Sequence, residues 1–167
     1  MTLTDLLPTL RASIADPLDV DAWPAGTRAA VGDVAVGGRS LARLAALQGT
    51  PCACSTAAAV PCTGGRPSPS HRAGAVVVAV RAIDETGAVA VGADLAGTSL
   101  ACADVALRWT EARLIGRAST ARRASTPVGG GCALLPVDLR VGDLLAVPTE
   151  AWAEVQDGAD ARTRRHA

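Results

Sequence analysis

The chain of 167 residues contains no lysine, asparagine, tyrosine or phenylalanine. All 16 of its lysine-or-arginine positions are therefore arginine. Without lysine, the protein cannot bind pyridoxal phosphate as a lysine Schiff base, and it cannot hold a nucleotide with a P-loop lysine. Its only aromatic residues are Trp23, Trp109 and Trp152, and we expect these to anchor the core or an interface.

The chain also lacks net charge and long apolar runs. Its 16 basic and 16 acidic side chains give a formal net charge of zero, which argues against a protein that tracks nucleic-acid phosphates. No run approaches the ~20 apolar residues that a membrane helix needs, and the segment 1–11 has no basic start typical of a signal peptide. We therefore expect a cytoplasmic protein without nucleic-acid or membrane partners, whose five cysteines stay reduced.

Short apolar segments separated by turn residues predict a mainly β fold. A helix is expected over 40–47, with Ser40 as its N-cap and Gly49 after its end. We predict a small β-barrel or sandwich with one or two short helices. The expected strands are 31–36, 75–83, 88–93, 106–118 and two within 134–147, of which 144–147 (LLAV) is apolar throughout and central, and 84–87 is a hairpin turn.

The domain organisation follows from where these patterns stop. We predict a short helix within 1–15, a single β-barrel domain over 16–150 and a polar tail over 151–167. Residues 52–72 combine small side chains, several prolines and a Gly-Gly pair, so we predict a linker there. Such a linker would be dispensable for folding.

Two stretches of the sequence resemble one enzyme family. Residues 22–51 read AWPAGTRAAVGDVAVGGRSLARLAALQGTP, and residues 135–148 read LPVDLRVGDLLAVP. With 73–82 and 112–120 they resemble, in the same order, the opening segment and the C-terminal β domain of meso-diaminopimelate decarboxylases. The resemblance implies a Greek-key β-barrel like the C-terminal domain of alanine racemases and decarboxylases. The family's catalytic (β/α)8 barrel, which carries the cofactor lysine between these two parts, has no counterpart in this chain.

The resemblance also implies a few relic site residues. Cys132 matches a family cysteine that reaches a neighbouring subunit's active site, but Ala133 stands where the family has a glutamate. Trp152 replaces a tyrosine that contacts the cofactor, and Arg66 in a Gly-Gly-Arg segment matches a phosphate-binding loop. Cys132 is thus the one candidate catalytic residue, and Arg66 and Trp152 are relic cofactor-binding candidates. No covalently bound pyridoxal phosphate is expected.

Three cysteines and a histidine form a C-x-C-x7-C-x8-H pattern: Cys52, Cys54, Cys62 and His71. Cysteine and histidine can bind zinc in a tetrahedral site. A C-x-C pair, however, lacks the usual gap of two to four residues, so small thiols without a metal are the alternative. Neither His71 nor His166 is expected to act as a general base, because one lies in the linker and the other in the tail.

These observations leave several functions open. The first is a non-catalytic module that forms a homodimer or pairs with a full-length decarboxylase-like protein through an uncovered apolar face, for which 144–147 and Trp152 are candidates. The second is a small enzyme or ligand-binding protein that reuses the barrel through Cys132 or the cysteine-rich segment. The third is a degraded or deleted gene product without a selected function.

Overall fold

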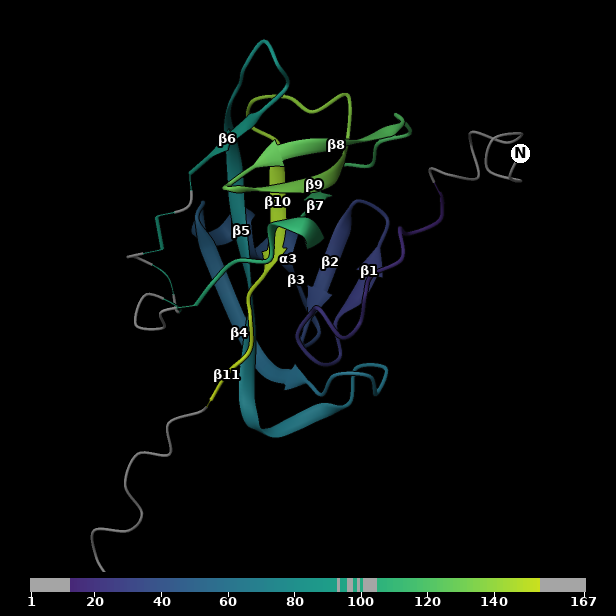
Figure 1. Ribbon diagram of the computed structural model, residues 1–167, viewed down its shortest axis with the longest axis vertical. Helices are drawn as coiled ribbons and strands as arrows, with labels where there is room; N and C mark the ends of the chain where they lie inside the picture. The colour runs from purple at the N-terminus through teal and green to yellow at the C-terminus, as the bar shows by residue number, and fades with distance from the viewer. Residues whose placement is uncertain (1–12, 93, 96–97, 99, 101–104, 154–167) are drawn as a thin grey trace, which may run out of the picture.

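The fold is mainly β, as predicted, with a nearly closed, barrel-like sheet and little helix (Figure 1). The computed structural model describes residues 13–92, 94–95, 98, 100 and 105–153. In chain order the elements are β1 (Arg28–Ala30), β2 (Asp33–Val36), β3 (Arg39–Ser40), α3 (Leu41–Gln48), β4 (Cys52–Ala59), β5 (Pro67–Ile83), β6 (Val89–Val91), the 3-10 helix η1 (Trp109–Glu111), β7 (Arg113–Ile115), β8 (Arg123–Val128), β9 (Gly131–Pro136), β10 (Leu144–Pro148) and β11 (Trp152–Ala153).

The strand β5 connects most of the molecule. Strands β1, β2 and β3 form a small sheet, and the larger sheet has the order β7-β10-β5-β6-β8-β9, with β4 and β11 also paired to β5. Because β5 has 17 residues, it is long enough to pair with β11 and β4 near its start, with β10 in its middle and with β6 at its end. Figure 1 shows it running through the full height of the sheet.

The middle of the larger sheet is buried on both faces. Ala75 and Val77 of β5 belong to an apolar core that Trp23 and α3 share, whereas Val76 and Val78 belong to a second core shared with β8 and β9. A strand that meets water on neither face takes apolar residues at every position instead of alternating. This explains why residues 75–80 are apolar at every position. The prediction that 144–147 is a central strand is also confirmed, because β10 lies between β7 and β5.

Helix α3 forms where the sequence predicts it. The Ser40 hydroxyl accepts a hydrogen bond from the Arg43 backbone N–H at 3.0 Å, which caps the first turn. Gly49, at a φ of 79°, ends the helix in a conformation that favours glycine. The buried Leu41 and Ala45 place α3 in the core with Trp23.

The predicted linker over 52–72 is the main error of the sequence interpretation. Residues 52–59 are strand β4, which pairs with β5 from Cys52 opposite Val77 to Ala57 opposite Arg72, and β5 itself begins at Pro67. Only a short turn separates the two strands. Small residues suit β4 because its alternate side chains enter the two cores, one beside α3 and the other beside Leu100. Composition alone made this strand look like a loop.

Other predicted elements are shorter than expected or lie outside the described residues. Of the segment 31–36, Val31 and Gly32 form the turn after β1 and only Asp33–Val36 is a strand, β2. The segment 106–118 contains only η1 and β7. The helix within 1–15 and most of the tail over 151–167 fall outside the described residues, although the tail begins with β11. Within the described part of the chain, no helix is long and apolar enough to cross a membrane.

Candidate functional site

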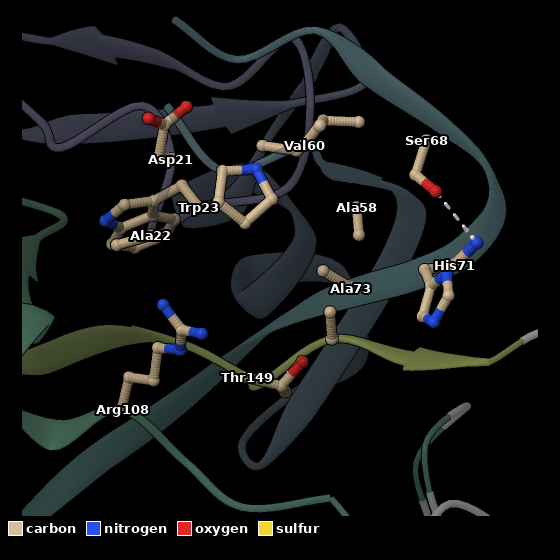
Figure 2. Close-up of a pocket in the computed structure, with 13 residues that line it drawn as sticks. Asp21, Ala22, Trp23, Ala58, Val60, Ser68, His71, Ala73, Arg108 and Thr149 are labelled. Atoms are coloured by element: carbon tan, nitrogen blue, oxygen red, sulfur yellow. Dashed lines mark hydrogen bonds between the residues drawn. The ribbon is translucent and has the colours of Figure 1, made fainter. Parts of the chain in front are cut away.

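A cavity of about 360 Å³ with a mostly apolar lining lies beside the β4–β5 hairpin and is the candidate site (Figure 2). Its walls come from the segment before β1, the end of β4, the turn after β4 and the start of β5. Arg108, which lies just before η1, and the residues that follow β10 complete the walls. The lining residues are Asp21, Ala22, Trp23, Ala58, Ala59, Val60, Pro61, Ser68, His71, Ala73, Arg108, Thr149 and Ala151.

The cavity exists because its walls are made mostly of small side chains. Five alanines line it, including Ala58, which Figure 2 shows on the cavity wall, and Ala73. An alanine side chain ends at Cβ, so facing alanines leave unfilled space where larger residues would meet. Trp23 closes one wall and is only 1% exposed, which confirms that this tryptophan anchors the core.

Two polar groups that line the cavity already have their partners. Asp21 accepts hydrogen bonds from the backbone N–H groups of Cys62 at 2.8 Å and Gly65 at 2.9 Å, so it holds the β4–β5 turn in place. The buried Thr149 hydroxyl accepts from the Gly74 N–H at 2.8 Å and donates to the Glu150 carbonyl at 2.9 Å. Both side chains serve the fold, and neither needs a ligand.

Arg108 differs because its guanidinium has no such partner in the described part of the chain. Its backbone N–H donates to the Pro148 carbonyl at 2.8 Å, which fixes the residue beside β10. The half-buried side chain lines the cavity below Trp23 in Figure 2. Within the described ranges, the guanidinium makes no hydrogen bond or ion pair. A partly buried cation without a counter-charge favours an anionic ligand.

His71 lies on the side of the cavity away from Arg108 (Figure 2). Its ring Nδ1 is 3.0 Å from the Ser70 hydroxyl, and its backbone N–H donates to the Ser68 hydroxyl at 3.1 Å. The residue is exposed. It therefore forms part of the rim of the cavity.

The structure keeps the residues singled out by sequence away from one another. Cys132 is exposed on the outer face of β9, Arg66 is exposed in the β4–β5 turn, and Trp152 on β11 packs against the second core. None of the three lines the cavity. No nearby base activates Cys132 among the hydrogen bonds and ion pairs of the described residues.

The cysteine-histidine pattern is also dispersed. Cys52 and Cys54 are buried in the first core, while Cys62 is exposed in the turn and His71 lies on the cavity rim. No group of three or more cysteine, histidine or acidic residues in the described part of the chain could hold a metal ion. Burial raises the pKa of both the Cys52 and the Cys54 thiols, as expected for protonated thiols inside an apolar core.

The sequence interpretation missed Arg108 and the role of Trp23 as a cavity wall. No motif marks either residue, because the cavity is assembled from segments up to 130 positions apart, from Asp21 to Ala151. The only local signal is an arginine next to a tryptophan at 108–109, which is too common to predict a site. Comparison of the chain with protein-family models, curated proteins and solved structures finds no match.

Proposed function

We propose that this protein is a non-catalytic binding domain that takes a small organic molecule into the cavity beside β4 and β5. The observation that carries the proposal is an apolar hollow in which one cation, Arg108, has no partner among the described residues. Its volume of about 360 Å³ falls within the usual range of small-molecule sites. This is the ligand-binding alternative from the sequence, moved from Cys132 and the cysteine-rich segment to a different set of residues.

The surroundings of the nucleophilic side chains support a binding role over a catalytic one. Ser70 and His71 form a 3.0 Å contact, but they are adjacent in the chain and both exposed. A working nucleophile and base need a third group that orients the base. No described carboxylate contacts the His71 ring.

Binding of a neutral dye tests whether the cavity takes a ligand. N-phenyl-1-naphthylamine fluoresces in apolar surroundings and carries no charge. We expect saturable binding of one dye per chain. The substitution Ala58→Leu fills the hollow and should weaken binding by about fivefold or more, and Ala151→Leu at the exposed rim should act in the same direction without disturbing the core.

Ala90→Leu is the matched control, because Ala90 is exposed on β6 and does not line the cavity. It should bind the dye like the parent protein. The proposal is overturned if the parent protein shows no saturable binding. It is also overturned if folded Ala58→Leu and Ala151→Leu both bind as tightly as Ala90→Leu.

A second candidate function, association with another protein chain, is favoured by one apolar region of the surface. Leu134, Val137 and Val141 are 56%, 51% and 65% exposed and lie within eight positions, at the end of β9 and in the turn before β10. Val137 also lines a hollow of about 210 Å³, together with Pro127 and Leu139. This region replaces the predicted one, because Leu145, Ala146 and Val147 of the LLAV strand are 0% exposed.

We propose a second copy of this chain as the partner at this surface. A net charge of zero leaves little repulsion to oppose self-association. Sedimentation velocity should show a dimer that Val141→Asp shifts to monomer. Leu47→Asp, which changes a residue 76% exposed on α3, should leave the dimer intact. A parent protein that stays monomeric at high concentration, or a dimer that only Leu47→Asp disrupts, contradicts this proposal.

The resemblance to diaminopimelate decarboxylases leads to a related proposal, in which the chain is a decarboxylase-like β domain without the catalytic barrel. The residues of 22–51 and 135–148 and the mainly β, barrel-like fold support it. A full-length decarboxylase-like protein would then be the heteromeric partner. Co-sedimentation with such a protein tests this version, and Val141→Asp should abolish the complex while Leu47→Asp should not.

A further inference from the structure

We infer that the ligand of the cavity is a monocarboxylate with an apolar body, and that its carboxylate binds the guanidinium of Arg108. The inference rests on the proposed binding function, and it adds the chemical class of the ligand. Three features of the cavity support it: the cation without a partner among the described residues, the acid that is already engaged and the small apolar walls.

The unpaired cation sets the sign of the ligand's charge. Arg108 is half-buried beside Trp23, so its guanidinium is partly removed from water. Two other half-buried arginines differ in this respect, because each has an acidic partner within the chain. Arg113 lies 4.0 Å from Glu111, and Arg117 lies 2.6 Å from Asp143. An anion in the cavity would give Arg108 the counter-charge that those arginines have within the chain.

The acid on the cavity wall does not compete for this role. Asp21 directs one carboxylate oxygen to the Cys62 N–H and the other to the Gly65 N–H, and Figure 2 shows it on the opposite side of Trp23 from Arg108. Both oxygens already accept hydrogen bonds, so a cationic ligand would have to share them. The charged group of the ligand is therefore expected next to Arg108 and away from Asp21.

The number of N–H donors that one guanidinium offers favours a carboxylate over a phosphate as the ligand's charged group. A guanidinium presents two parallel N–H groups that match the two oxygens of a carboxylate. A phosphate carries more charge and more acceptor oxygens than one arginine can satisfy. Among the described residues, Arg108 is the only arginine that lines the cavity, and His71 lies across it.

The remaining walls set the character of the ligand's body. Ala58, Ala59, Val60 and Ala73 offer no hydrogen-bonding side chain, and Trp23 adds a large apolar surface. Burying a polar body against such walls without partners would be unfavourable, whereas each buried CH₂ group stabilises the complex by about 0.8 kcal/mol. An alkyl or aryl carboxylate matches both ends of the cavity.

Displacement of the neutral dye by a matched pair of ligands tests the inference. Octanoate and octanamide have the same chain and nearly the same shape, and only octanoate is charged at pH 7.5. At low ionic strength, octanoate should displace N-phenyl-1-naphthylamine from the parent protein at about a fivefold to tenfold lower concentration than octanamide. Arg108→Gln should remove this preference, so that octanoate and octanamide displace the dye at equal concentrations whatever the variant's own affinity for the dye.

Arg122→Gln is the matched control, because Arg122 is exposed, does not line the cavity and loses the same charge. It should keep the preference for octanoate. If the dye binds but octanoate and octanamide displace it equally, or if Arg122→Gln reduces the preference as much as Arg108→Gln does, the inference is wrong while the proposed function stands. If the dye does not bind at all, the proposed function itself fails.

Discussion

At the scale of single residues, Arg117 makes the most extensive polar contacts of the described chain. Its Nε and Nη2 donate to the two oxygens of Asp143 at 2.9 and 2.6 Å, and its Nη1 and Nη2 donate to the side chain and the backbone carbonyl of Asp138 at 3.2 and 2.9 Å. Ser119 adds a hydrogen bond to Asp138 at 2.7 Å. Asp143 also accepts a hydrogen bond from the Arg140 N–H at 2.9 Å.

These contacts make stability depend on pH. Burial alone would raise the pKa of Asp143, but the hydrogen bonds from Arg117 and the Arg140 N–H outweigh it, so that pKa is lowered on folding. The Ser119 hydroxyl, with help from Arg117, likewise lowers the pKa of Asp138. A carboxylate with a depressed pKa stabilises the fold above its unfolded pKa of about 3.9, and this contribution is lost as the pH falls through the lower folded value.

We therefore expect Asp143→Asn to reduce the free energy of unfolding by about 2 kcal/mol at pH 7, because it removes charge-assisted hydrogen bonds from a largely buried site. The difference from the parent protein should shrink as the pH falls below about 4. Urea denaturation at pH 7 and at pH 3 measures both values. Glu85→Gln, at the exposed hairpin tip, should leave stability unchanged at both. A deficit of Asp143→Asn that is as large at pH 3 as at pH 7 would contradict the assignment.

The four cysteines that the structure describes separate into two reactivity classes. Cys52 and Cys54 are buried with a raised pKa, whereas Cys62 and Cys132 are exposed. Iodoacetamide at pH 7.5 should label the exposed pair in the folded protein and reach the buried pair only after unfolding. Peptide mass spectrometry resolves each site, with a urea-unfolded sample as the reference. Equal labelling of Cys54 and Cys132 in the folded state would show that β4 is not the buried strand described above.

At the scale of elements, the β8–β9 hairpin depends on two consecutive glycines. Gly129 and Gly130 have φ values of 55° and 92°, as the two positions of a tight hairpin turn require. Their surroundings differ. A Cβ on Gly129 would lie 2.2 Å from the Trp109 ring, whereas a Cβ on Gly130 would meet nothing within 4 Å.

Alanine at each position separates backbone strain from steric conflict. Gly130→Ala should cost about 1 kcal/mol of stability, because only the positive φ is disfavoured. Gly129→Ala should cost roughly 2 kcal/mol more, because Trp109 must also move. Urea denaturation followed by circular dichroism measures both variants. Equal losses would mean that Trp109 does not pack under this turn.

Local signals predicted some of these elements and misjudged others. The Ser40 cap, the Gly49 stop and the turn at 84–87 are short-range features, and all three occur as predicted. Strand β4 was missed because what makes it a strand is its pairing with β5 and its burial between two cores. Neither cause is visible in a run of alanine, cysteine and serine, so the tertiary context overrides weak local preference.

At the scale of the whole molecule, the fold class was predictable and the candidate site was not. Apolar segments with turn residues between them required a mainly β chain. The cavity, in contrast, depends on where Asp21, Ala58 and Arg108 meet after folding, and on which of their polar atoms already have partners. The sequence contains the residues but not the distances between them after folding. For that reason the sequence interpretation favoured cysteines that lie apart in the structure.

The two-sided burial of β5 and β10 has a consequence for how this sequence can change over time. In an ordinary half-buried strand every second position faces water and accepts almost any residue. From 75 to 80 and from 145 to 147, no position is free in this way, because neighbouring side chains enter different cores. Substitutions at any of these positions in β5 and β10 should therefore be poorly tolerated. In β8 and β9, by contrast, every second position should accept them. Among proteins related to this one, we therefore expect the amino-acid sequence to vary at the hairpins and outer strands and to stay almost unchanged in β5 and β10.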